Sequence, residues 1–423
     1  MKRYPAMVVV ALTVVAAAAA GGSPDAGIES TIRFLTAPVL AGRGSGSPGL
    51  RATADSLASW LESAGWQPGY GESWFQDYDL RGEGWAGQDL TGLPGRNVAG
   101  ILPGRGSLVG RWLVIGAHYD HLGRVAPAAA DAPPPEPDGY YPGANDNASG
   151  VSVVLETVRQ LAAADPLQDA RSIMVVFFGD EETGLQGSTA FVATPPLDLD
   201  VVDVMVNLDT VGKLHDGSLY VSGVGTSARL REIAAAAAGS LHLELAEGGW
   251  SGSDHMSFNT HEVPVLFLFG GPYRDYNRPT DTWDNLVAAD LQTVLGYTGR
   301  LIGILRADPG EFSWIMVGDG PLRSDDGAGE GNRDTWFGSL PDFAEGVAGY
   351  KLAGVFDDSP AAEAGLQKGD VLVRLGGAEV TDLASFTKAL RAHDPGNLVE
   401  VELRRAGSLL RFTVVLGNRS DRR

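Results

Sequence analysis

The stretch FFGDEETGLQGS, residues 177–188, joins the end of an apolar run to two adjacent glutamates. The run, residues 173–178, has no polar side chain, which is typical of a strand buried on both faces of a parallel sheet. Glu181 and Glu182 follow it, and ligands in α/β folds gather at the carboxyl ends of such strands. One glutamate can bind a metal while its neighbour takes a proton from water. Paired glutamates are also common at helix starts, so the pair counts only together with other clusters.

Other polar clusters follow predicted strands or lie in glycine-rich loops. In chain order they are HYDH at 118–121, GANDNASG at 143–150, Asp209 after a strand at 201–208, and YNRPTDT at 276–282. Between them the apolar spacing predicts helices over residues 148–164, 228–238 and 286–306. This alternation of strands and helices predicts a three-layer α/β/α domain with a mostly parallel central sheet.

The side chains in these clusters suit a hard or borderline metal ion. The candidate ligands are His118, Asp120, Asp146, Glu182 and Asp209. Histidine with carboxylates and no cysteine favours Zn²⁺, and one carboxylate can bridge two ions about 3.5–4 Å apart. In His-x-Asp the histidine is the better ligand, and Asp120 can orient its imidazole. Each residue taken alone has a structural alternative, since Asp146 can cap a helix and Asp209 a turn.

Six motifs then point to a family. In chain order HYDHLG, GANDNASG, FFGDEETGLQGS, NLDTVG, SDHMSF and YNRPTDT resemble the motifs of the co-catalytic zinc aminopeptidases. That family includes leucine-type aminopeptidases, aminopeptidase Y, glutamate carboxypeptidase and glutaminyl cyclase. The resemblance covers residues 28–307 and implies a zinc exopeptidase fold there. Six motifs in the family order are far more specific than one short motif.

The resemblance implies catalytic roles for three side chains. Glu181 would be the general base that deprotonates the bridging water and passes the proton to the leaving amine. Asp120 would orient the imidazole of His118. Tyr276 matches a position where some members have a tyrosine that polarises the scissile carbonyl.

The resemblance also implies two zinc sites that share Asp146. One site would use His118 and Asp209, and the other would use Glu182 and the residue at position 277. There the family has histidine and this chain has Asn277, whose amide oxygen is a weak zinc ligand. We therefore expect two zinc ions, the second weakly bound, and expect Asn277→His to strengthen that site.

Two alternatives to a weak second site stay open. The chain can hold one metal or be inactive, or another histidine can supply the missing ligand. The candidates for that ligand are His121, His255 and His261.

A second pattern of short strands and small helices begins near residue 333. DDSPAAEAGL at 357–366 and KGDVL at 368–372 resemble PDZ domains of the bacterial HtrA type. The resemblance covers residues 336–416 and implies a small α+β domain that binds a peptide as an added strand. The loop residues expected to hold the peptide's terminal carboxylate are Trp336, Phe337, Gly338 and Ser339. The alternative is a packed accessory domain without a free peptide.

Composition and the N-terminus suggest where the protein works. The net charge of −21 argues against nucleic acid as a partner. Lys2 and Arg3 precede an apolar run over 7–20, shorter than the ~20 residues of a membrane-spanning helix. This pattern predicts a signal peptide over residues 1–22 and an exported protein, periplasmic or secreted, with no stable membrane insertion after cleavage. An uncleaved anchor is the alternative.

These inferences predict a signal peptide, a zinc peptidase domain over 28–307, a linker over 308–332 and a PDZ domain over 333–418. The function they favour is a zinc-dependent exopeptidase, in particular an aminopeptidase acting on peptides, with the PDZ domain recruiting them. The alternatives are a single-zinc cyclase or transferase, a carboxypeptidase, or a catalytically impaired peptide-binding protein.

Overall fold

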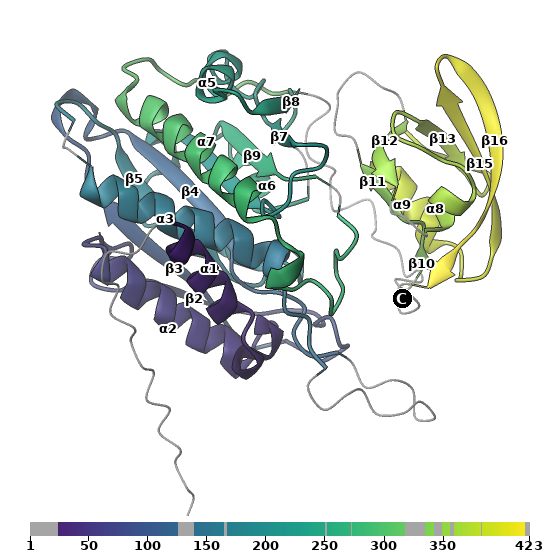
Figure 1. The fold of residues 1–423 in the computed structure, drawn as a ribbon, viewed down its shortest axis with the longest axis horizontal. Coiled ribbons are helices and arrows are strands. Elements are labelled where there is room, and N and C mark those ends of the chain that lie inside the picture. The colour runs from purple at the N-terminus through teal and green to yellow at the C-terminus, as the bar shows by residue number, and fades with distance from the viewer. Residues whose placement is uncertain are drawn as a thin grey trace, which may run out of the picture.

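Figure 1 shows a larger domain built on a mostly parallel sheet and a smaller antiparallel domain, drawn in yellow-green. The computed structural model describes residues 24–125, 139–164, 167–249, 252–271, 273–317, 335–341, 349–355, 359–381 and 383–418. The predicted signal peptide lies outside these residues. In the described part of the chain, no helix combines the length and the apolar composition that crossing a membrane requires.

The central sheet of the larger domain is parallel in its middle. Its strand order is β1-β3-β5-β4-β6-β9-β7-β8, with β2 paired to β3. The parallel strands are β5 (Ser172–Phe178), β4 (Trp112–His118), β6 (Val202–Asp209) and β9 (Val265–Phe269). Every side chain of β5 is buried, because helices cover both faces of the sheet, and this explains its apolar sequence. Since these strands are parallel, their carboxyl ends lie at one edge of the sheet.

Antiparallel strands extend the sheet on both sides. β3 (Pro94–Leu102) runs antiparallel to β5, and β7 (Ser218–Ser222) runs antiparallel to β9. The remaining strands are β1 (Gln67–Pro68), β2 (Phe75–Asp79) and β8 (His242–Ala246). The prediction of a mostly parallel sheet is confirmed, with antiparallel pairs added at its edges.

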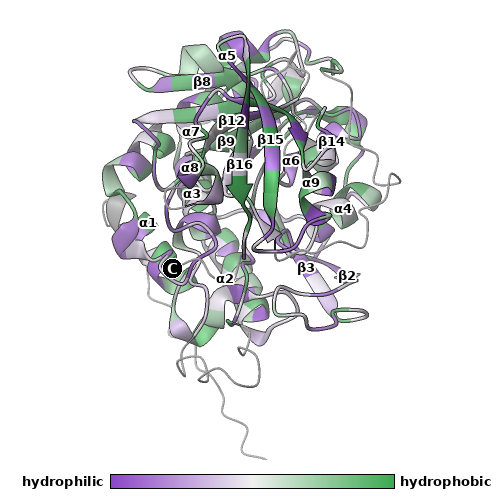
Figure 2. Cartoon of the chain, turned by 90° about the vertical axis from the view of Figure 1, so that its right-hand side faces the viewer, coloured by the Kyte–Doolittle hydropathy of each residue, from purple (hydrophilic) through white to green (hydrophobic). Residues whose placement is uncertain are grey.

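Helices cover the two faces of the sheet. One layer consists of α1 (Pro24–Leu35), α2 (Pro48–Ser63), α3 (Gly150–Ala163), α5 (Leu230–Ala237) and α7 (Ala288–Ala307). The other consists of α4 (Gln186–Ala193) and α6 (His255–Asn259). The helices carry both hydrophilic and hydrophobic residues, as expected where one face is buried (Figure 2). Short helical turns complete the domain: η1 (Pro38–Arg43), η2 (Gly106–Leu108), η3 (Ala144–Ser149), η4 (Leu199–Val201) and η5 (Trp283–Asn285).

The first part of the predicted linker is fixed to the larger domain. Residues 308–317 form no helix or strand, but the buried guanidinium of Arg171 donates to the carbonyl oxygens of Asp308 and Gly310. Arg229 forms a bidentate ion pair with the Asp308 carboxylate. We therefore treat this segment, the strap, as part of the larger domain. The rest of the predicted linker, 318–332, lies outside the described residues.

The smaller domain is an antiparallel sheet with two short helices, as predicted. Its strand order is β11-β12-β13-β15-β16, with β14 paired to β13 and β10 paired to β17. The elements are β10 (Thr335–Trp336), β11 (Ser339–Pro341), β12 (Tyr350–Val355), α8 (Pro360–Glu363), β13 (Val371–Leu375), β14 (Ala378–Glu379), α9 (Leu383–Arg391), β15 (Leu398–Arg405), β16 (Ser408–Val415) and β17 (Gly417–Asn418). Leu352, Leu372 and Val401 lie in its fully buried core. β11 lies at an edge of this sheet, where a further strand can pair.

Candidate metal centre

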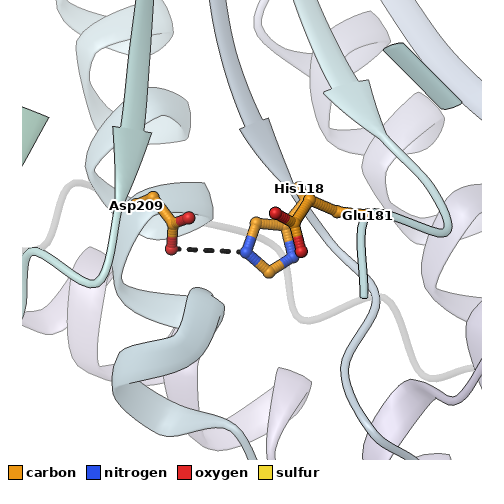
Figure 3. Close-up of side chains that lie close together, drawn as sticks. All are labelled: His118, Glu181 and Asp209. Atoms are coloured by element: carbon orange, nitrogen blue, oxygen red, sulfur yellow. Dashed lines mark hydrogen bonds and ion pairs between the residues drawn. The ribbon is translucent and has the colours of Figure 1, made fainter. Parts of the chain in front are cut away.

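Neighbouring parallel strands bring two acidic side chains close to one histidine. His118 is the last residue of β4, Asp209 is the last residue of β6, and Glu181 lies in the turn after β5. One ligand atom from each of the three side chains lies within 4.8 Å of the others (Figure 3). His118 Nε2 is 3.3 Å from Asp209 Oδ1. Both His118 and Asp209 are buried.

Asp146 presents its two carboxylate oxygens to two different histidines. Oδ1 lies 3.3 Å from His118 Nε2, and Oδ2 lies 4.0 Å from His121 Nδ1. Ligand atoms 2.0–2.1 Å from a tetrahedral zinc ion are about 3.3 Å apart. Asp146 and Asp209 therefore each approach His118 Nε2 at the separation of two ligands of one zinc ion, while Asp146 Oδ2 faces His121.

The candidate ligands form two groups whose ligand atoms lie within 4.8 Å of one another. One group is His118, Glu181 and Asp209, and the other is His121, Asp146 and Glu182. In the second group His121 Nδ1 lies 2.7 Å from Glu182 Oε1. The arrangement is that of two adjacent sites linked through Asp146.

Asparagines fix the glycine-rich loop GANDNASG to the end of β6. Asn147 Nδ2 donates to the carbonyl oxygen of Leu208 at 2.9 Å. Asn145 Oδ1 accepts the backbone N–H of Gly212 at 2.7 Å. These hydrogen bonds hold Asp146, which lies between the two asparagines, close to Asp209 at the end of β6.

Two further aspartates hold the backbone of the ligand loops. The Asp120 carboxylate accepts the N–H of Glu181 at 3.1 Å and of Glu182 at 3.2 Å, and lies 3.5 Å from His118 Nδ1. It therefore lies where a residue that orients His118 must lie, and it also positions both glutamates. The second aspartate, Asp281, belongs to the cluster YNRPTDT, but sequence reasoning assigned it no role.

Asp281 is buried beneath the loop that carries Asp146. Its carboxylate accepts the N–H of Asn145 at 2.9 Å and of Asp146 at 3.1 Å. The hydroxyl of Tyr273 donates to the same carboxylate at 3.1 Å. Asp281 thus fixes the backbone at Asp146, the carboxylate that links the two ligand groups.

A buried arginine ties two ligand loops together, and sequence reasoning missed it. Arg43 has no exposed surface, and its guanidinium donates to the carbonyl oxygens of Tyr119 (2.9 Å), Pro142 (2.8 Å), Gly143 (3.1 Å) and Leu35. Arginine is almost never fully buried without partners, so an arginine inside the loop AGRGSGSPG is expected at the surface. Only the folded chain shows that its partners are carbonyl groups.

The candidate metal centre contains more buried carboxyl groups than basic side chains. Burial raises the pKa of Glu181 and of Glu182 well above the usual value, and neighbouring carboxylates raise it further. Burial also raises the pKa of Asp180, Asp254 and Asp281 to about 7. Divalent cations would relieve this crowding of carboxylates, so the donor set fits a metal centre.

The pKa values of His118 and His121 shift in opposite directions. Burial works to lower the pKa of His118, but the carboxylates of Asp209 and Glu181 outweigh it and raise that pKa well above its usual value. Burial lowers the pKa of His121 to about 4, so its imidazole is neutral near pH 7. A neutral imidazole is the form that binds a metal ion.

The loop that carries Tyr276 and Asn277 lies beside the metal centre, and Asn277 is the residue that departs from the family pattern. Burial and the carboxylates of Asp146 and Glu182 raise the pKa of Tyr276 well above its usual value, so its phenol stays a hydrogen-bond donor. Asn277 follows with φ of 55°, and its Oδ1 atom is buried without a hydrogen-bond partner among the described residues.

The other two candidate histidines lie apart from both ligand groups. His255 is buried and stacks on Phe267, with ring centroids 4.3 Å apart. His261 lines a cavity of about 320 Å³ beside Arg111 and Trp314, and its Nδ1 lies 2.8 Å from the carbonyl oxygen of Ser257. Among the residues that the structure describes, neither belongs to a group that could hold a metal.

The predicted peptide loop of the smaller domain combines buried aromatic side chains with a glycine in the left-handed backbone region. Trp336 and Phe337 are buried, and Gly338 has φ of 81°. A Cβ atom at position 338 would lie 2.2 Å from the Cβ of Ser359, so only glycine fits. Ser339 begins β11, the edge strand.

Comparisons with known proteins agree with this fold. Residues 97–299 match the model of peptidase family M28, and residues 339–416 match the model of the PDZ domain. The larger domain is therefore an M28 peptidase domain, and the smaller one is a PDZ domain.

Similarity to individual proteins is moderate. A probable leucine aminopeptidase of Trichophyton verrucosum is 27% identical over 219 residues, which are 49% of this chain and 55% of that protein. The chain spans about half the length of the curated relatives it matches.

Two solved structures share the fold. BSAP, a zinc aminopeptidase from Bacillus subtilis, superimposes with a TM-score of 0.53 at 18% identity, over 69% of this chain and 98% of that one. The glutaminyl cyclase of Porphyromonas gingivalis does so with a TM-score of 0.52 at 20% identity, over 66% and 98%. At such identities the likeness establishes the fold alone.

Proposed function

We propose that this chain is a zinc-dependent aminopeptidase that hydrolyses the N-terminal peptide bond of peptides. The observation that carries the proposal is the pair of ligand groups linked through Asp146, with Glu181 beside His118. A two-metal hydrolase needs two adjacent ligand sets, a carboxylate between them and a base within reach.

Glu181 is the residue we assign to proton transfer. Zinc ions, when bound, polarise the scissile carbonyl and lower the pKa of water. Glu181 lies next to the proposed ligands but is held through its backbone by Asp120, which leaves its carboxylate available for a proton. We assign it to take the proton from water and to deliver it to the leaving amine. Tyr276, protonated and beside the same carboxylates, donates a hydrogen bond to the substrate carbonyl.

We choose an aminopeptidase over a carboxypeptidase on the evidence of sequence relatives. These relatives include a probable leucine aminopeptidase of Trichophyton verrucosum and an aminopeptidase of Bacillus subtilis.

For the PDZ domain we propose binding of a peptide or protein C-terminus beside β11. The edge position of β11 and the glycine turn at Gly338 support it, since strand addition needs both a free edge and close backbone approach. We further propose that residues 1–22 direct export to the periplasm or the medium. N-terminal sequencing of the exported protein would test this, with a start near residue 23 expected.

Hydrolysis of aminoacyl p-nitroanilides by the zinc-loaded chain tests the activity. Free-amine substrates should be cleaved, N-acetylated ones should not, and Glu181→Gln should lower kcat about 10²–10⁴-fold. Glu72→Gln, an exposed glutamate, is the matched control. Cyclisation of glutaminyl peptides without anilide hydrolysis would contradict the proposal and favour a cyclase.

A further inference from the structure

We propose that His121 supplies the imidazole ligand of the second metal ion, in place of the residue at position 277. This inference rests on the proposed metal-dependent function and names a ligand that the family pattern does not provide. The loop HYDH would then serve both ions, His118 binding one and His121 the other.

The position of the His121 imidazole supports this assignment. Nδ1 faces the two carboxylates of the second ligand group, 2.7 Å from Glu182 Oε1 and 4.0 Å from Asp146 Oδ2. These distances bracket the value of about 3.3 Å expected between two ligands of a tetrahedral zinc ion. One ligand atom from each of the three side chains lies within 4.8 Å of the others, so the three side chains can converge on one ion.

The imidazole is also held in this position. His121 is buried, and its backbone N–H donates to the carbonyl oxygen of Arg43 at 3.2 Å. The ring lies edge-on to Tyr141, with centroids 6.5 Å apart. It packs so closely on the GANDNASG loop that a Cβ at position 143 would lie 2.5 Å from His121 Cδ2, so Gly143 is required there. A preformed ligand loses little entropy on metal binding.

The alternatives at this site are weaker. Asn277 offers only an amide oxygen, a poor zinc donor compared with an imidazole nitrogen. His255 stacks on Phe267, and His261 lines the cavity beside Arg111. Of the three candidates raised by the sequence, His121 is the histidine that joins a ligand group in the described part of the chain.

Metal stoichiometry of the full chain tests the proposal. Wild type should bind two zinc ions, and His121→Gln should bind one tightly and the other at least about 100-fold more weakly. His255→Gln, which also removes a buried imidazole, should keep two ions. Unfolding temperature of each metal-free variant checks folding.

Rescue separates a ligand from a structural residue. Asn277→His placed on His121→Gln should restore the second ion. In the wild type Asn277→His should change zinc affinity little, in contrast to the gain expected from the sequence if position 277 supplied the ligand. A merely structural role for His121 would not be repaired from position 277. Two ions bound with wild-type affinity by His121→Gln would overturn the proposal, as would one ion in both proteins.

A measurement on unaltered protein covers the case in which the variants do not fold. Zinc K-edge X-ray absorption on the two-zinc wild type should give about one imidazole per zinc, because His118 and His121 each bind one ion. About half an imidazole per zinc would exclude His121. Neither readout depends on turnover, so correct ligation without peptidase activity would reject the proposed function and leave this inference standing.

Discussion

At the scale of single residues, the centre is organised by side chains that hold other side chains. Asp120 fixes the backbone of Glu181 and Glu182, and Arg43 joins the loop of the two histidines to the loop that carries Asp146. The sequence could single out the side chains that the structure brings together, because each follows a buried strand or lies in a glycine-rich loop. It could not identify Arg43, since an arginine in a polar loop is ordinarily solvated.

Arg43 offers a prediction at this scale. Arg43→Lys keeps the charge but cannot donate to carbonyl groups in several directions, so zinc affinity should fall about 10–100-fold. Chelator competition would measure the dissociation constant, with exposed Arg33→Lys as the control. Unchanged affinity in Arg43→Lys would mean that the arginine does not position the ligand loops.

At the scale of elements, the long buried strands were predictable and the short elements were not. The strands predicted over 173–178 and 201–208 appear as β5 and β6 within one residue of the predicted limits. Sequence analysis missed α4, α6, β2 and β8. Each is at most eight residues long, too short for a clear periodic pattern, and the sheet it packs on decides its conformation.

The loop that carries Asp146 gives the prediction for this scale. Asp281→Asn keeps the size but removes the charge that accepts the N–H groups of Asn145 and Asp146. The loop should loosen, and zinc affinity should fall about 10–100-fold while the fold is retained. Titration calorimetry with zinc measures this. Tight zinc binding by Asp281→Asn would show that the loop is positioned by Asn145 and Asn147 alone.

At the scale of the whole molecule, the chain combines a peptidase domain, the strap and a PDZ domain. The class of each domain could be predicted, because six motifs and the PDZ pattern occur in family order. The strap could not, since it begins the stretch 308–331, whose many glycines and aspartates are typical of a linker, and its partners, Arg171 and Arg229, are distant in the chain.

Truncation tests the strap. A chain ending at residue 317 should bind zinc and hydrolyse small anilides like the full protein. A chain ending at residue 307 leaves the buried Arg171 without two carbonyl acceptors, which should cost roughly 2–5 kcal/mol of unfolding free energy. Urea denaturation of both chains measures the difference, and equal stability would mean that the strap only rests on the surface.

Metal removal should reveal the charge of the centre. Asp180, Asp254 and Asp281 have pKa values of about 7 in the folded chain, against an ordinary value of 3.8. Between about pH 4 and 7 the unfolded state therefore binds fewer protons than the folded state. Stability of the metal-free protein should fall as pH rises through this window. Zinc should oppose the fall, because it binds the deprotonated ligands.

Thermal unfolding in a chelator across pH 4.5–7.5 measures this dependence. Asp281→Asn should flatten part of the slope, since the amide does not titrate. A metal-free unfolding temperature that rises with pH through the same window would contradict the account of the buried acids.

A crystal structure of the zinc-loaded chain, with anomalous scattering measured at the zinc edge, tests the two-site centre most directly. We predict two peaks about 3.5–4 Å apart on either side of Asp146, one against His118 and Asp209 and the other against His121 and Glu182. A single peak, or a second peak away from Asp146, would contradict the two-metal site on which the proposed activity depends.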